Sequence, residues 1–171
     1  VFEVIEAKKI FDISYKKLSI IIHPKSYVHA ILKFNNGLTK IIVHDTSMKI
    51  PIFNSLYSSK KIINSKKLDF KILNNLDFRY ANPKKFPIIK ILKMLPDNTS
   101  LFETILVSIN DKLVDLFLNN KLKFTDISKK MNKIMNLYSL KKYKKIKPKN
   151  IEEIIETNMK IKNDIEYLMK K

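Results

Sequence analysis

Two carboxylates near the start of the chain have a spacing that would let them act together. Glu3 and Glu6 lie three residues apart in a segment, residues 2–12, whose apolar periodicity predicts a helix. Residues at this separation are neighbours on a helix surface, so the pair could bind a hard divalent cation or act as acid and base. Acidic residues in a first helical turn also complement the helix dipole. Spacing alone favours this second, structural interpretation.

The three histidines follow in a β-rich block. His23 and His29 flank Pro24-Lys25-Ser26, and their separation fits no standard zinc spacing. A histidine at a strand end could hydrogen-bond a sugar hydroxyl or a phosphate, or it could only satisfy local backbone. The residues leave that choice open, while the isolated His44 is interpreted as a surface residue. The sequence therefore predicts no structural zinc site.

Strand and turn signals predict the elements that carry these histidines. Residues 18–23, 27–34 and 38–43 are β-prone. Asn35-Asn36-Gly37 is a hairpin signal, because Asn and Gly adopt positive φ at little cost. We expect three strands, of which the last two pair antiparallel. A helix is expected from about residue 51, followed by irregular structure over residues 58–87.

The C-terminal half has the apolar periodicity of three helices, ending near residues 119, 137 and 168. Their expected N-terminal caps are Ser100 with Glu103, Thr125, and Asn150 with Glu153. Residues 141–149 are expected to form a charged connector. The predicted fold class is α+β: a small, mostly antiparallel sheet with flanking helices, followed by an α-helical bundle domain. We place the boundary between residues 1–75 and 76–171.

The formal net charge of +18 raises the question of a nucleic-acid partner. Arg79 is the only arginine among 34 basic residues, whereas recognition of bases and phosphates usually favours the planar guanidinium fork. Lysine is frequent everywhere in the chain, so solvated lysine faces are the favoured interpretation and a polyanion-binding surface is the alternative. We expect no nucleic-acid partner, although the charge should speed encounter with phosphorylated small molecules.

Composition excludes several kinds of site. Gly37 is the only glycine, whereas dinucleotide motifs and P-loops need several glycines at fixed spacing. Any phosphates of a cofactor must therefore be held outside this chain. The absence of cysteine removes disulfides and thiolate metal sites and suits a reducing compartment. No apolar run approaches the length of a membrane span, so no membrane partner is expected.

Several short motifs, in order, resemble one enzyme family. E-V-I-E-A at residues 3–7, I-I-H-P-K-S-Y-V-H-A at 21–30, N-G at 36–37 and M-K-I-P-I at 48–52 resemble the middle of 1-deoxy-D-xylulose 5-phosphate reductoisomerase. That family usually has N-K-G-L-E-x-I-E-A, I-H-P-Q-S-x-V-H-S, D-G and P-D-M-R-x-P-I. The similarity continues to about Leu137. The order and spacing of the motifs, more than any single one, make the resemblance specific.

The resemblance implies an activity and its cofactors. The family converts 1-deoxy-D-xylulose 5-phosphate to 2-C-methyl-D-erythritol 4-phosphate, a step of non-mevalonate isoprenoid synthesis. The substrate is a phosphorylated sugar, NADPH is the reductant, and Mg²⁺ or Mn²⁺ holds the substrate's oxygens. A homodimer in the bacterial cytoplasm is implied, with a plastid-type organelle as the alternative location. Residues 1–75 would complete the catalytic α+β domain and residues 76–171 would form the C-terminal helical domain.

Residue by residue, the resemblance gives several positions a role. Glu3 matches the glutamate that binds the metal and meets the substrate, which reverses its structural interpretation. Glu6 would be supporting or structural. His29 matches a histidine of the active site, Ser26 matches a substrate-binding position, and Met48 would lie on the nicotinamide side.

The sequence also departs from the family pattern. Val1 stands where the family has glycine, and Thr46-Ser47 replaces its Pro-Asp. The preceding Asn-Lys pair, the D-S-E metal ligands and the NADPH-binding domain would all lie upstream of Val1. We therefore interpret the chain as a C-terminal fragment that is inactive alone. A basic nucleic-acid-binding module and a structural helical scaffold are the alternatives from other classes.

Overall fold

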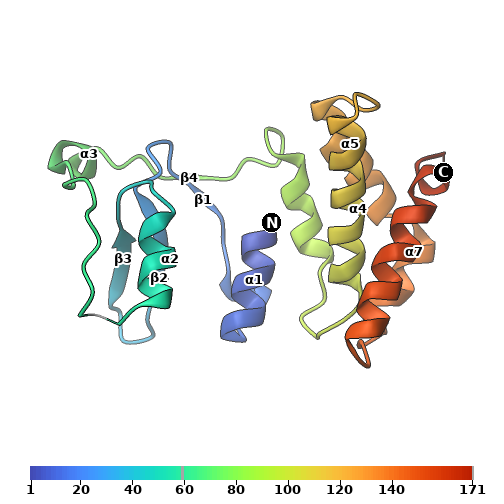
Figure 1. Cartoon of the computed structure of the whole chain (residues 1–171), viewed down its shortest axis with the longest axis horizontal. Coiled ribbons are helices and arrows are strands. Elements are labelled where there is room, and N and C mark those ends of the chain that lie inside the picture. The colour runs from blue at the N-terminus through green and yellow to red at the C-terminus, as the bar shows by residue number, and fades with distance from the viewer. Residues whose placement is uncertain (59, 171) are drawn as a thin grey trace. The chain divides into compact units, whose positions relative to one another are not determined.

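The computed structural model describes residues 1–58 and 60–170. The chain forms two compact units, unit 1 (Val1–Ile20 with Ala81–Lys171) and unit 2 (Ile21–Tyr80). The elements follow the chain from blue to red in Figure 1. In chain order they are α1 (Phe2–Phe11), η1 (Tyr15–Lys17), β1 (Ile21–Ile22), β2 (Val28–Lys33), β3 (Thr39–Val43), α2 (Lys49–Leu56), α3 (Phe70–Asn74), β4 (Arg79–Tyr80), η2 (Pro87–Met94), α4 (Phe102–Leu118), α5 (Phe124–Met135), α6 (Tyr138–Lys141), η3 (Lys142–Lys145) and α7 (Ile151–Lys170).

The buried core lies in unit 1. The central helix α4 packs against α5 and α7, and α5 packs against the 3₁₀ segment η2. Ile105, Ile109 and Leu113 of α4 are fully buried, at the i, i+4, i+8 spacing of one helix face. Burial of each such side chain stabilises the fold by about 1.5–3 kcal/mol. Ile5 of α1 joins the same core, so α1 belongs to this helical unit.

Helix caps in unit 1 confirm one sequence prediction and correct another. The Asn150 side-chain oxygen accepts the Glu153 amide at 2.9 Å, and a Glu153 carboxylate oxygen accepts the Lys149 amide at 2.7 Å. The expected cap of α7 is therefore confirmed. Thr125 does not cap α5, because α5 already begins at Phe124 after Lys123.

The expected connector, residues 141–149, begins as helix rather than as an irregular linker. The end of α6 and the whole of η3 occupy residues 141–145. The amide of Leu101 donates to the carbonyl of Ile146 at 2.8 Å. This segment is therefore attached to the chain just before α4.

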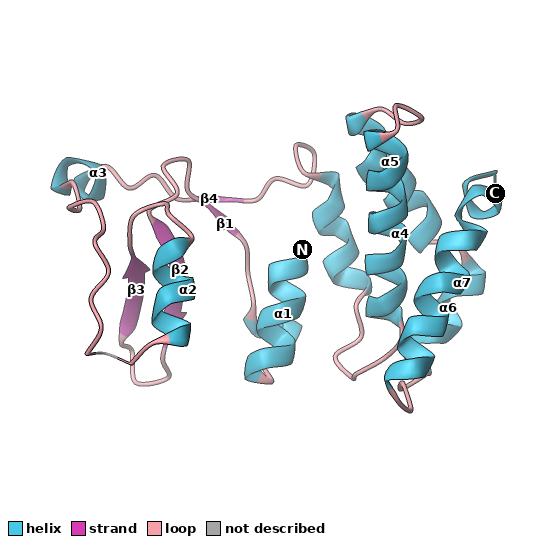
Figure 2. Ribbon diagram, viewed as in Figure 1, coloured by secondary structure: helices cyan, strands magenta, loops and turns pink. Residues whose placement is uncertain are grey.

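Unit 2 is a small antiparallel unit. Strands β2 and β3 pair from Lys33↔Thr39 to Val28↔Val43, with a register shift between Val28 and Ala30. Gly37 has φ +86° in the predicted hairpin turn. β1 is limited to two residues and pairs antiparallel with β4, Ile21 opposite Tyr80. Figure 2 shows these strands in magenta, and the predicted α+β class is confirmed.

Two short elements of unit 2 fall within the region expected to be irregular. Asp69 caps α3 by accepting the Lys71 amide at 2.8 Å, and β4 follows five residues after α3.

The two compact units are defined by contacts within the chain, whereas the boundary expected at residue 75 separates domains of the family. That boundary stays a prediction. None of the described helices is at once long enough and apolar enough to traverse a bilayer.

Candidate functional site

Glu3 lies in the first turn of α1, with its side chain exposed. Its carboxylate forms no hydrogen bond and no ion pair with any residue that the structure describes. A carboxylate offers the hard oxygen ligands that Mg²⁺ binds. An exposed, unpaired carboxylate on an ordered helix therefore fits the chemistry of a metal ligand. Glu6 is also exposed, one turn further along α1.

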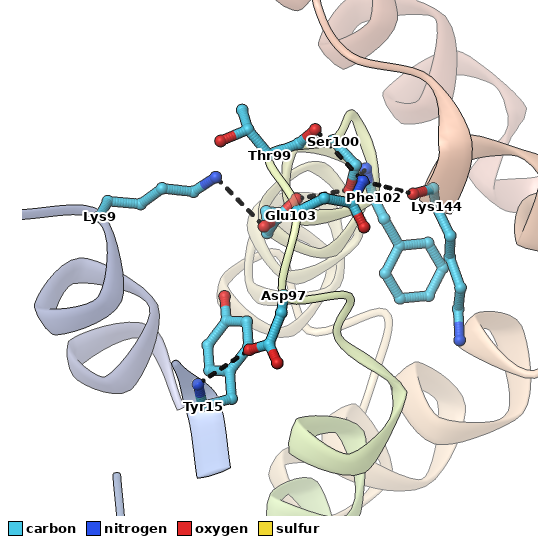
Figure 3. A network of polar contacts seen from close by, with 9 residues as sticks. Lys9, Tyr15, Asp97, Thr99, Ser100, Phe102, Glu103 and Lys144 are labelled. Carbon is cyan, nitrogen blue, oxygen red and sulfur yellow. Dashed lines mark hydrogen bonds and ion pairs between the residues drawn. The ribbon is translucent and has the colours of Figure 1, made fainter. Parts of the chain in front are cut away.

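A polar network connects the other end of α1, and the residues just after it, with the segment that leads into α4 and with the first turn of α4 (Figure 3). The ammonium of Lys9 lies 3.3 Å from Oε1 of Glu103. The Tyr15 amide donates to Oδ1 of Asp97 at 3.0 Å, and the Ser14 hydroxyl donates to the same carboxylate at 3.0 Å. These three interactions join residues 9–15 to residues 97–103.

Glu103 is the buried acid of this network. The Ser100 hydroxyl donates to Oε2 of Glu103 at 2.8 Å and accepts the Phe102 amide at 3.2 Å. The Ser100–Glu103 spacing suggested a reciprocal capping box, in which the Glu103 amide would donate to the Ser100 hydroxyl. Ser100 instead binds the Glu103 side chain, which leaves the other carboxylate oxygen for Lys9.

Two ionisation equilibria are shifted in the network. Hydrogen bonds from the Tyr15 amide and the Ser14 hydroxyl hold the pKa of Asp97 below its usual value. Burial raises the pKa of Tyr15 to about 12, and the charges of Glu103 and Asp97 add to the rise. The Tyr15 hydroxyl oxygen is buried without a hydrogen-bond partner among the described residues. The buried Lys8 places its ammonium 5.7 Å from the centre of the Tyr15 ring.

Ser26 and His29 lie at the start of the β2–β3 hairpin. Ser26 adopts φ +55° in the turn after Pro24, and its amide donates to the His23 carbonyl at 3.0 Å. His29 occupies the register shift of β2. A bulge of this kind re-aims side chains and is frequent beside active sites. Both side chains are exposed.

His44 is not the isolated surface residue that its sequence context indicated. Its ring stacks on His29, with centroids 3.5 Å apart and planes 4° from parallel. His44 Nδ1 lies 2.6 Å from the Asp45 carbonyl oxygen. The half-buried His44 therefore restricts the orientation of the His29 ring. Sequence alone could not have shown this, because the contact depends on the hairpin register.

Met48 immediately precedes α2, and its side chain is 64% exposed. Ser26, His29 and Met48 all belong to unit 2, whereas Glu3 belongs to unit 1. Within the described part of the chain, no three His, Asp or Glu side chains are grouped so that they could hold a metal ion. Of Glu3, Ser26, His29 and Met48, only Glu3 offers a carboxylate ligand.

Comparison with known proteins identifies similar sequences. A family model described as the DXP reductoisomerase C-terminal domain matches residues 44–164. A 1-deoxy-D-xylulose 5-phosphate reductoisomerase of Pelagibacter ubique is 59% identical over 159 residues, which cover 92% of this chain and 41% of that protein. The enzyme of Sulfurihydrogenibium sp. is 34% identical over 128 residues, which cover 74% of this chain and 34% of that protein. The chain thus spans well under half the length of these curated relatives.

Solved structures of reductoisomerases have a similar fold over nearly the whole of this chain. The Zymomonas mobilis reductoisomerase in complex with NADPH matches with a TM-score of 0.79 and 25% identity, over 98% of this chain and 43% of that chain. A DOX-P reductoisomerase in complex with NADPH, fosmidomycin and magnesium matches with a TM-score of 0.83 and 24% identity, over 98% of this chain and 42% of that chain.

Proposed function

Since the chain belongs to the DXP reductoisomerase C-terminal domain family, we propose that it is the C-terminal part of a 1-deoxy-D-xylulose 5-phosphate reductoisomerase. The complete enzyme would be an oxidoreductase that rearranges and reduces 1-deoxy-D-xylulose 5-phosphate to 2-C-methyl-D-erythritol 4-phosphate with NADPH. The proposal is supported by the relatives of that name and by the motifs at residues 3–7 and 21–30. The fragment alone would be inactive, because it offers one metal ligand and no glycine-rich phosphate loop.

The single observation that carries the proposal is the exposed, unpaired carboxylate of Glu3 on α1. We propose that Glu3 binds Mg²⁺ or Mn²⁺ together with ligands from the preceding part of the enzyme, and that it contacts the substrate. When bound, such a cation polarises the substrate carbonyl and stabilises negative charge on oxygen. Glu3 itself would contribute a negative charge and fix the direction of one coordination bond.

We propose that three residues of unit 2 contact the substrate and the cofactor in the complete enzyme. His29 would contact the reacting substrate, with its ring orientation restricted by stacking on His44. Ser26 would donate its hydroxyl to the substrate. Met48, exposed at the start of α2, would pack against the nicotinamide of NADPH, whose phosphates are held outside this chain.

Replacing Glu3 by Gln in the complete enzyme tests the proposal. The amide keeps the size of the side chain but removes the anionic ligand, so the Mg²⁺ concentration for half-maximal rate should rise by about 100-fold. NADPH oxidation, followed across a Mg²⁺ titration, measures this. Asp12→Asn is the matched control, because it makes the same chemical change at the other end of α1, where Asp12 has φ 49° and Asn tolerates that conformation. An unchanged metal dependence in Glu3→Gln would refute the role.

We propose further that the complete enzyme is a homodimer of the bacterial cytoplasm. One face of the β2–β3 hairpin exposes apolar side chains, and this supports a second copy as a partner. The apolar side chains that share this face by the strand register are Leu32, Phe34, Leu38 and Ile42. The named relatives are bacterial, and the absence of cysteine suits a reducing compartment.

A further inference from the structure

Glu103 lies in the helical unit, far along the chain from the motifs that suggest the reaction. We propose that Glu103 is a positioning residue for Glu3: through its ion pair with Lys9 it holds α1 in the orientation that presents the Glu3 carboxylate. This inference rests on the proposed metal-binding role of Glu3. By this inference, the C-terminal helical unit helps to orient the carboxylate that binds the metal.

The Lys9–Glu103 ion pair is largely buried on the side of Glu103. The Glu103 side chain is 8% exposed, the Lys9 side chain is 36% exposed, and their charged atoms are 3.3 Å apart. A buried carboxylate is costly unless it is paired and hydrogen-bonded. Glu103 is held on one side by the Ser100 hydroxyl at 2.8 Å, so Lys9 supplies the balancing charge on the other. Any displacement of α1 that separates the pair leaves a buried anion without its cation.

A second tether acts on the chain just after α1. The carboxylate of Asp97 accepts hydrogen bonds from the Tyr15 amide and the Ser14 hydroxyl. Asp97 and Glu103 lie six residues apart in the sequence, and Figure 3 shows both acids beside the residues that they bind. The two tethers therefore restrain α1 at Lys9 and restrain the chain again where it leaves the helix.

The segment that carries both acids is itself fixed to the bundle. The Leu101 amide donates to the Ile146 carbonyl at 2.8 Å, and the Asn98 side chain donates to the Lys144 carbonyl at 3.2 Å. Phe102 is fully buried in the core. Residues 97–103 are thus attached to the helical bundle by two hydrogen bonds and by the burial of Phe102, and α1 is held against them.

The helix transmits this restraint to Glu3. Glu3 and Lys9 lie six residues apart on α1, roughly 9 Å along the axis at the usual rise per residue. With ten residues, α1 is too short to be stable by itself in water, so its order depends on these contacts and on the burial of Ile5. A metal ligand has to lie within a few tenths of an ångström of its bonding position. Loss of the Lys9–Glu103 pair should therefore weaken metal binding without removing a ligand.

The experiment compares four variants of the complete enzyme: Glu103→Gln, Glu3→Gln, the double variant, and the control Asp115→Asn. Asp115 lies on the same helix α4 and pairs with Lys112 at 3.5 Å, so the control removes an ion pair and a negative charge without involving α1. Hydrogen exchange of the α1 amides, without metal or substrate, measures the order of the helix. A Mg²⁺ titration of NADPH oxidation measures the metal constant and the kcat at saturating Mg²⁺.

We expect Glu103→Gln to speed exchange of the α1 amides and to raise the apparent Mg²⁺ constant by about tenfold, with kcat at saturating Mg²⁺ changed less than about twofold. Added to Glu3→Gln, the same change should have no further effect on the metal constant, because Glu103 acts through Glu3. Asp115→Asn should leave both measurements unchanged. If Glu103→Gln does not fold, Lys9→Gln breaks the same pair from its exposed side and should give the same result.

Two outcomes overturn the inference alone. In the first, Glu3→Gln changes the metal constant and Glu103→Gln does not. In the second, the effects of Glu103→Gln and Glu3→Gln on the metal constant are simply additive. An unchanged metal constant in Glu3→Gln overturns the proposed function itself, and the positioning role with it. The Glu3→Gln measurement therefore distinguishes the two failures.

Discussion

Tyr15 carries a buried hydroxyl that has no hydrogen-bond partner among the described residues. Leaving such a group unpaired costs about 1–3 kcal/mol. Replacing Tyr15 by Phe removes the hydroxyl, keeps the ring beside Lys8, and leaves intact the backbone amide that binds Asp97. We therefore expect Tyr15→Phe to raise the free energy of unfolding by about 1 kcal/mol at neutral pH, measured by urea denaturation.

The advantage of the Phe variant should grow in alkaline solution. The tyrosine pKa is 10.0 ordinarily and about 12 in the folded chain. Between these values the unfolded chain has lost the proton and the folded chain has kept it, so the stability of the wild type falls as the pH rises. Tyr15→Phe lacks this contribution. A stability difference that shrinks between pH 10 and 12 would contradict the buried, unpaired placement of the hydroxyl.

At the residue scale, a role can be predicted from sequence only where a local motif indicates it. Glu3, Ser26, His29 and Met48 were selected by their places in motifs, and their roles stay predictions. Glu103 was recognised only as a helix-capping residue, because its ion pair with Lys9 joins positions 94 residues apart in a sequence of 171. The stacking of His44 on His29 was missed because it depends on the register of the β2–β3 hairpin. No local signal reports a contact that only the tertiary fold creates.

At the scale of elements, the cap of α7 gives a direct test of local interactions. The side chain of Asn150 accepts the Glu153 amide at 2.9 Å, while Glu153 accepts the Lys149 amide. Asn150→Ala removes one of these bonds, and we expect a loss of about 1 kcal/mol in the free energy of unfolding. Asn150→Gly should lose only a few tenths of a kcal/mol. An unchanged free energy of unfolding in Asn150→Ala, measured by thermal and urea unfolding, would show that the Asn150 cap bond adds nothing.

Elements with strong periodicity or turn chemistry were predicted well. Helices α1, α4 and α7 and the β2–β3 hairpin lie close to their expected ranges. Only part of the apolar face of α7 is buried, because Ile161 and Ile165 are buried whereas Ile151 is 69% exposed. Periodicity shows which residues share a face but not how much of the helix reaches a partner. β1 and β4 have two residues each, too few for any pattern to predict their pairing.

At the scale of the whole molecule, the order of the motifs was the most informative feature. The resemblance, which continues from the motifs at residues 3–52 to about Leu137, is confirmed by the family model over residues 44–164 and by the named relatives. Composition limits the possible sites for a different reason, since dinucleotide motifs and P-loops need several glycines and the chain has one. The distribution of the core could not be predicted, because apolar residues are plentiful in both units.

The uneven core predicts uneven stability within the isolated chain. No described residue of unit 2 (residues 21–58 and 60–80) is buried, whereas Ile105, Leu106 and Ile109 of α4 are completely buried. Local opening free energies range from near zero in such weakly packed regions to the global value in a core. Amides of β2 and β3 should therefore exchange at least about 1,000-fold faster than amides of α4 in the 171-residue chain.

The same exchange rates should differ between the isolated chain and the complete enzyme. If unit 2 is part of a larger catalytic domain, the apolar side chains of the hairpin are covered there, and exchange in β2 and β3 should slow while exchange in α4 stays nearly constant. Hydrogen exchange of both proteins, read by mass spectrometry on the same peptides, measures this. Amides of α7 serve as the internal control, because that helix packs on α4 within unit 1. Slow exchange of the hairpin in the isolated chain would mean that unit 2 is stable without a buried core or a partner.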